Sequence, residues 1–324
     1  MQQVELDGLN KPVSRLVHGS TGLMGVEDSV AFPVLDAAVE AGVNAFDTAT
    51  VYAFDGYSMD AMLGRWIRER DARDEVVVIA KGAHPKVPES TAPRVNPTAV
   101  AEDIDLTRER MGVDHLDLWL FHRDDPAVDV GSLVEAVDSA IAQGSIRAWG
   151  VSNWSVARIQ AAIAYAADND RRPPVVNSAH YSLATQLDSP WDDVVTLTGD
   201  DHAADRSWHV DGDVKVLAWS PLAGGFLSER VSRDDLENEP APPLADTARC
   251  YLNEQNWQRR ERAAQVGRRM GLSLSQTALA WVFAADFRPM AIAGSVTPNE
   301  VRENVAAAGA QLTAADVSYI NDGV

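Results

Sequence analysis

The sequence predicts an α/β fold, a closed (β/α)8 TIM barrel with an N-terminal hairpin and long loops after the sixth and seventh strands. Eight short apolar runs alternate with longer, amphipathic, Ala-rich segments, the pattern typical of βαβ units around a parallel sheet. No linker or shift in composition marks a second domain, and barrels of this kind often exceed 200 residues. We therefore expect residues 1–324 to form one barrel domain.

The expected strands are short and mostly apolar, as buried parallel strands are. They span residues 15–19, 44–47, 75–80, 116–121, 146–151, 175–178, 215–219 and 290–293. The segment before residue 15 is expected to form a hairpin that covers the floor of the barrel.

The expected helices follow the strands in turn, and several begin at proline or end before glycine. They span residues 30–41, 58–69, 97–111, 133–143, 156–167, 191–196, 255–270 and 298–308. Two segments, 187–213 with eight aspartates and 224–254 with prolines at 240–243, are longer than ordinary loops. Loops of that length are often lids or binding loops, and the aspartates are expected to form a solvated acidic face.

The charge balance and the cysteine count limit the classes of partner. The chain has 28 Lys and Arg against 48 Asp and Glu, a net charge of −20, which repels nucleic acid and anionic membrane surfaces. Cys250 is the single cysteine, which excludes an internal disulfide and favours a reducing compartment. The first ten residues lack the pattern of a signal peptide, so we expect a cytoplasmic protein.

Polar residues close three neighbouring strands, where the active sites of such barrels lie. They are Asp47, Lys81 and His122, and Tyr52 follows Asp47 by five residues. Taken singly, each has a structural explanation: a turn cap, a lysine at a strand end, a core histidine and a packed tyrosine. Together they form a proton-transfer site, because an ammonium group beside a tyrosine lowers its pKa and Asp47 supplies the counterion. The set holds no nucleophile, no metal cluster and no source of electrons, so the electrons must come from a cofactor.

The chain resembles the aldo-keto reductase family over nearly its whole length. The resemblance rests on residues 46–49 (FDTA), Tyr52, Ser58, 63–64 (LG), 80–81 (AK), 120–123 (LFHR), 144–147 (GSIR), 150–153 (GVSN), 218–222 (AWSPL), 294–297 (GSVT), Glu303 and Asn304. It implies reduction of a small-molecule carbonyl substrate with NADP(H) or NAD(H). It assigns Tyr52 as general acid, Lys81 as its activator, Asp47 as the partner of Lys81, and His122 as the group that orients the carbonyl.

The resemblance also implies a cofactor site across the barrel mouth. Ser152 and Asn153 would hold the carboxamide and Trp219 would stack on the nicotinamide ring. The remaining implied contacts are Gly19, Ser178, Ser220, Pro221, Leu222, Gly294, Ser295, Val296, Thr297, Glu303 and Asn304.

Three positions depart from the family pattern. Gly294 and Glu300 stand where many members have basic residues that grip the 2′-phosphate of NADP(H), so the preference between the two cofactors is open. Arg302 could substitute only if its side chain turns back. Ser178 stands where many members have a glutamine, and a hydroxyl reaches less far.

Two other classes of protein share this architecture. One is an accessory or regulatory subunit that binds a nicotinamide cofactor with slow or no turnover, and the other is a metal-assisted lyase, which needs clustered carboxylates at strand ends. Five apolar residues are expected to line the substrate pocket: Leu23, Met24, Phe54, Trp154 and Phe226.

Overall fold

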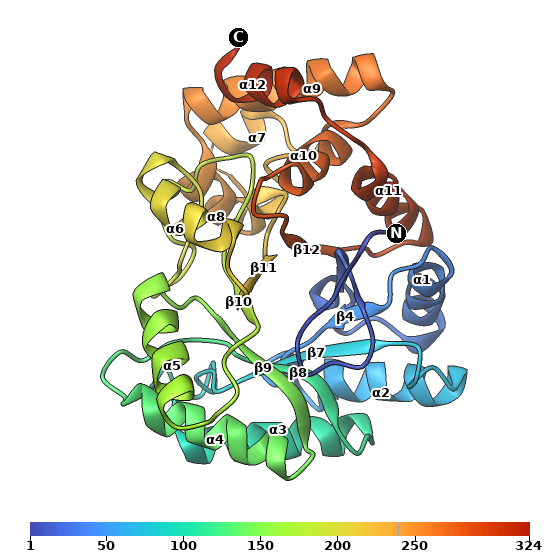
Figure 1. The fold of residues 1–324 in the computed structure, drawn as a ribbon. Helices are drawn as coiled ribbons and strands as arrows, with labels where there is room; N and C mark the ends of the chain where they lie inside the picture. The colour runs from blue at the N-terminus through green and yellow to red at the C-terminus, as the bar shows by residue number, and fades with distance from the viewer. Residues whose placement is uncertain (239) are drawn as a thin grey trace.

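A computed structural model describes residues 1–238 and 240–324 and contains a closed eight-stranded barrel, which confirms the predicted fold class (Figure 1). Neighbouring strands pair in parallel around the ring in the order β10-β11-β12-β3-β4-β7-β8-β9. The bounds are β3 (Leu16–Gly19), β4 (Ala45–Asp47), β7 (Val77–Gly82), β8 (Leu116–Phe121), β9 (Ile146–Ser152), β10 (Val176–Ser178), β11 (Lys215–Ala218) and β12 (Met290–Gly294).

Helices surround the barrel on the outside (Figure 1). Those that follow the barrel strands are α1 (Asp28–Glu40), α2 (Met59–Arg70), α3 (Pro97–Met111), α4 (Val130–Ala142), α5 (Val156–Asp168), α6 (Ala203–Val210), α9 (Glu254–Met270), α10 (Leu274–Phe283) and α11 (Pro298–Gly309). Local signals fix their ends: the Asn96 side chain caps α3, and Gly112 ends it in the left-handed conformation. In the described part of the chain, no helix is long and apolar enough to cross a membrane.

The N-terminal hairpin closes the bottom of the barrel, as expected. It consists of β1 (Gln3–Val4) and β2 (Val13–Ser14), paired antiparallel. Leu6 and Val13 are buried in one apolar cluster with barrel residues that include Val17 and Val77. Because this end is sealed by apolar packing, the opposite end is left for the site.

The prediction of a helix at residues 191–196 is wrong, because this segment is a loop in the structure. Pro190 precedes it, and Val194, Val195 and Thr196 are β-branched residues that favour extended backbone. Thr196 forms a parallel bridge with His180, which fixes the loop against the barrel. The helix of this repeat is α6, further along the chain.

The long segment 224–254 contains two short helices that the prolines concealed. They are α7 (Arg233–Glu237) and α8 (Pro242–Tyr251), and Glu239 lies outside the described residues. Pro242 occupies the first turn of α8, where a missing N–H costs nothing. The C-terminal α12 (Ala314–Asp322) was also not expected.

Candidate functional site

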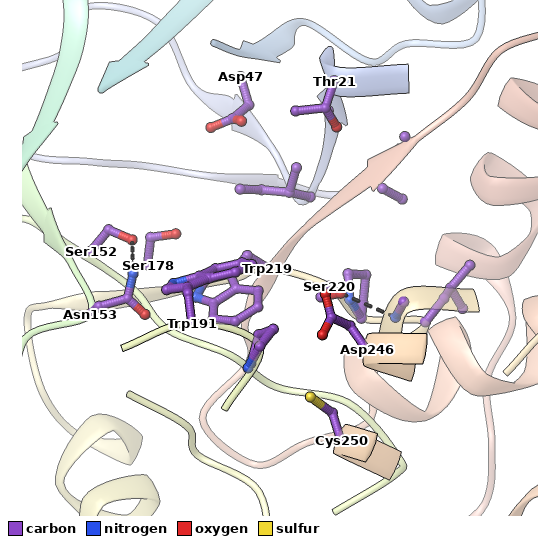
Figure 2. A pocket seen from close by; sticks show the side chains of 18 of the residues that line it. Thr21, Asp47, Ser152, Asn153, Ser178, Trp191, Trp219, Ser220, Asp246 and Cys250 are labelled. Carbon is purple, nitrogen blue, oxygen red and sulfur yellow. Dashed lines mark hydrogen bonds between the residues drawn. The ribbon is translucent and has the colours of Figure 1, made fainter. Parts of the chain in front are cut away.

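The carboxyl ends of the barrel strands surround a cavity of about 520 Å³. All four residues expected to be catalytic line it: Asp47, Tyr52, Lys81 and His122. Nine of the residues expected to hold a cofactor line it as well: Gly19, Ser152, Asn153, Ser178, Trp219, Ser220, Pro221, Leu222 and Gly294. Figure 2 shows Ser152, Asn153 and Ser178 close together, with Asp47 across the cavity from them.

Lys81 and Asp47 form a buried ion pair. They lie near the carboxyl ends of the adjacent strands β7 and β4, and the Lys81 Nζ donates a hydrogen bond to Asp47 Oδ1. The two residues are only 4% and 3% exposed. Burial raises the pKa of Asp47 against the opposing effect of Lys81. Burial also disfavours the charged form of Lys81, but the carboxylate of Asp47 outweighs it and raises the pKa of Lys81.

The half-buried Tyr52 lies beside this pair. The Lys81 Nζ is 5.6 Å from the centroid of the Tyr52 ring. Burial raises the pKa of Tyr52 above its ordinary value, and Lys81 only partly opposes this. Lys81 therefore acts on Tyr52 in the expected direction, but desolvation outweighs the ammonium charge, so the net pKa of Tyr52 lies above its ordinary value. A tyrosine that stays protonated at neutral pH retains a proton to donate.

His122 directly follows β8, the strand next to the β7 strand of Lys81, and is uncharged at neutral pH. Its ring meets that of Tyr52 edge-on, with centroids 5.9 Å apart. Burial lowers the pKa of His122 well below its ordinary value, and the charge of Lys81 adds to this. Its Nδ1 is buried and has no hydrogen-bond partner among the described residues.

Backbone strain marks the part of the cavity expected to hold the cofactor. Asn153 and Ser220 adopt φ angles of 60° and 51°, in the left-handed region that L-residues rarely occupy. Such strain concentrates at ligand sites. The hydroxyl of Ser178 is buried without a partner in the described part of the chain, although its neighbour Asn153 donates to Ser152 Oγ over 3.1 Å. These residues fit the polar carboxamide of a nicotinamide.

Trp219 is in contact with two aromatic rings. Trp191, from the loop after β10, stacks on it with centroids 5.3 Å apart and planes 25° apart (Figure 2). The centroid of the His180 ring lies 4.9 Å from that of Trp219, with the ring planes 56° apart. The two ring nitrogens of His180 form hydrogen bonds with the hydroxyl groups of Tyr251 and Thr196. The sequence did not indicate Trp191, because it lies in an irregular loop without hydrophobic periodicity.

The remaining residues expected at the adenosine end lie outside the cavity lining, around the start of α11. They are Ser295, Val296, Thr297, Glu303 and Asn304. The Thr297 hydroxyl caps α11, and Asn304 Nδ2 donates to Ser295 Oγ over 3.0 Å.

Glu300 joins this end of the site to the segment after β11. Its carboxylate accepts from the Val296 N–H over 2.8 Å and pairs with Arg230. Burial opposes its charge, yet Arg230 and the Val296 N–H hold the pKa of Glu300 below its ordinary value. Arg302 is exposed on α11. The sequence did not indicate the Glu300–Arg230 pair, whose members are 70 residues apart.

The prediction of which apolar residues line the substrate pocket is wrong. Leu23, Trp154 and Phe226 have no exposed surface and belong to the packed core, Met24 packs against the core, and Phe54 is exposed outside the cavity. Large apolar side chains in these loops are used to anchor them. The cavity is instead lined by Arg123, Pro190, Trp191, Tyr251 and Ile292.

Metal ligands are not gathered in the part of the chain that the structure describes. No group of three or more His, Cys, Asp or Glu side chains there could hold a metal ion. A metal-assisted lyase requires such a group at the strand ends, so the geometry gives that class no support.

Comparison with known proteins identifies the family. The model of the "Aldo/keto reductase family" matches residues 15–323. The chain is 27% identical over 281 residues to the "Putative voltage-gated potassium channel subunit beta" of Schizosaccharomyces pombe, covering 84% of this chain and 77% of the relative. It is 25% identical over 325 residues to the "Uncharacterized oxidoreductase YrpG" of Bacillus subtilis, covering 96% and 92%. It is 27% identical over 312 residues to the "Aldo-keto reductase str7" of Strobilurus tenacellus, covering 93% and 84%.

The chain therefore belongs to the aldo/keto reductase family, as the sequence motifs indicated. The family is one of oxidoreductases that use nicotinamide cofactors and small carbonyl substrates.

Proposed function

We propose that the protein reduces aldehydes or ketones to alcohols, using NADPH or NADH and Tyr52 as the proton donor. One observation carries the proposal: Tyr52, Lys81, Asp47 and His122 line the same cavity as nine residues expected to hold the cofactor. A nicotinamide dinucleotide, when bound, supplies the hydride that these side chains lack. The side chains supply the proton and the orientation of the carbonyl.

Each of the four polar residues has a separate task in this proposal. Tyr52 is protonated at neutral pH and donates its hydroxyl proton to the carbonyl oxygen, and the charge of Lys81, which lowers the pKa of Tyr52 against the effect of burial, strengthens it as an acid. Lys81 stabilises the tyrosinate that remains, and Asp47 keeps Lys81 charged in a buried site. The neutral ring of His122 donates a hydrogen bond to the same oxygen, which fixes the carbonyl beside Tyr52.

The residues at the start of α11 favour use of NADH as well as NADPH. A 2′-phosphate is bound best by Arg or Lys, through strong charge-assisted hydrogen bonds. Here Glu300 is a carboxylate, and it already engages both the Val296 N–H and Arg230. We therefore infer a preference for NADPH weaker than about tenfold, roughly 1.4 kcal/mol.

The test is a fluorescence titration with NADPH and with NADH, followed by cofactor oxidation with a panel of simple aldehydes. The proposal requires binding of at least one cofactor and aldehyde-dependent oxidation that follows Tyr52. One relative is named as a potassium channel subunit, which supports an alternative function: an accessory subunit that binds the cofactor with slow or no turnover. Tight cofactor binding without turnover on any aldehyde would favour that alternative.

A further inference from the structure

Arg123 lies in the cavity wall next to the residues proposed to hold the carbonyl. It directly follows His122 at the end of β8, and it lines the same cavity as His122 and Tyr52. The proposed chemistry gives it no task, since the proton, the tyrosinate and the carbonyl oxygen are already served by other groups.

The guanidinium of Arg123 has no carboxylate partner within 4.0 Å among the described residues. Within the described part of the chain, its guanidinium makes one hydrogen bond, from Nη1 to the His122 carbonyl, and this bond is long, at 3.4 Å. A guanidinium has five N–H donors, so most of those of Arg123 remain open. The other charged side chains of the cavity lining already have ion-pair partners: Lys81 pairs with Asp47, and Asp246 pairs with Arg249, which also pairs with Asp188. The exposed Asp193 lies nearby but outside ion-pair distance.

Trp191 supports the guanidinium from one side. The Arg123 Cζ lies 5.1 Å from the centroid of the Trp191 ring, and Trp191 stacks in turn on Trp219. Contact with an aromatic ring holds the flat face of a guanidinium and leaves its in-plane N–H groups available to a ligand. The cation is therefore presented at the cavity with its orientation restrained.

The position of Arg123 separates it from the expected phosphate sites of the cofactor. It follows β8, whereas Ser220, Pro221 and Leu222 follow β11 and the adenosine end follows β12. In the ring of eight strands, three strands lie between β8 and β12 in either direction, so the two are opposite. An anion bound by Arg123 therefore belongs to the substrate side of the cavity.

We propose that Arg123 forms an anion subsite that selects carbonyl compounds carrying a carboxylate a few bonds from the reacting carbonyl. This inference rests on the proposed carbonyl reduction and names its substrate class, the short oxo acids. The guanidinium fork binds the carboxylate through paired charge-assisted hydrogen bonds. Trp191 packs against the methylene groups between the two ends of the substrate.

The test compares 4-oxobutanoate with its methyl ester, which has the same aldehyde and chain but no charge. For the wild type, kcat/KM should be at least tenfold higher for the acid. In Arg123→Met, kcat/KM should fall at least tenfold for the acid and less than threefold for the ester. For the acid, kcat/KM of Arg123→Lys should lie between those of the wild type and Arg123→Met. Arg65→Met, which removes an exposed arginine paired with Asp28, controls for the change in net charge. Reduction of both aldehydes by the wild type with equal kcat/KM would overturn the proposal without recourse to a variant.

A binding measurement separates this proposal from the proposed reduction. Succinate cannot be reduced, and its binding beside Trp191 should change tryptophan fluorescence in the wild type and not in Arg123→Met. If neither aldehyde is reduced but succinate binds in an Arg123-dependent way, the reductase proposal fails and the anion subsite stands. If both aldehydes are reduced and Arg123→Met affects them equally, with unchanged succinate binding, the subsite fails and the reductase proposal stands.

Discussion

Replacing Lys81 by methionine tests the ion pair on which the proposed site depends. The substitution keeps an unbranched chain of similar length and removes the only partner that pairs with Asp47 within ion-pair distance among the described residues. Because Asp47 is 3% exposed, its carboxylate stays out of water after the change. Leaving one charge of a buried pair uncompensated costs about 3–5 kcal/mol, so Lys81→Met should lower the free energy of unfolding by about that amount.

The assay is urea unfolding of the wild type, Lys81→Met, Asp47→Asn and the double variant. The double variant should recover part of the loss, because it buries no charge, while carbonyl reduction stays absent. The penalty in Lys81→Met should also shrink as the pH falls, since burial raises the pKa of Asp47 and the carboxyl can then take up a proton. Equal stability of the single Lys81→Met and the double variant at neutral pH would refute the buried pair.

Two further predictions concern the cofactor and the acid stability. Glu300→Arg should raise the affinity for NADPH relative to NADH by more than tenfold. Glu300→Gln keeps an acceptor for the Val296 N–H and should change this relative affinity less. An unchanged ratio of the two dissociation constants in Glu300→Arg would show that residue 300 does not contact the 2′-phosphate. Burial lowers the pKa of His18 to about 4 and that of His180 to about 3. The free energy of unfolding is therefore unaffected by these two side chains above about pH 6.5, and it decreases as the pH falls below that value, because the unfolded chain then takes up protons that the folded chain does not. At pH 5 each should cost about 2 kcal/mol in urea unfolding, and His180→Gln should remove its share of the pH dependence; an identical pH profile would contradict a buried neutral His180.

The convergence of the four polar residues could be predicted because the topology dictates it. Parallel strands in a barrel carry their carboxyl ends at one mouth, so Asp47, Lys81 and His122 had to meet once the strands were recognised. The buried cysteine Cys250 and the ring of Tyr251 reach the same cavity from the end of α8, and the ring of Trp191 reaches it from the loop after β10. Their contacts follow from how these segments pack against the barrel, which hydrophobic spacing does not encode.

The assignment of the pocket walls failed for a related reason. Leu23, Trp154 and Phe226 were chosen as apolar residues in loops near strand ends, but apolar residues there are more strongly stabilised by burial in the core than in a wet cavity. The tyrosine pKa also could not be foreseen, because it depends on how far desolvation outweighs the nearby ammonium group. The sequence shows which charged residues are present, but it does not show how deeply the Tyr52 hydroxyl is buried.

The most direct test of the central claim is the turnover of Tyr52→Phe beside its affinity for the cofactor. The change removes one hydroxyl, so the dissociation constants for NADPH and NADH should stay within about twofold of the wild type, while kcat for aldehyde reduction falls by on the order of a hundredfold or more. Near wild-type turnover in Tyr52→Phe, on the same aldehyde and with the same cofactor, would contradict the claim that Tyr52 donates the proton.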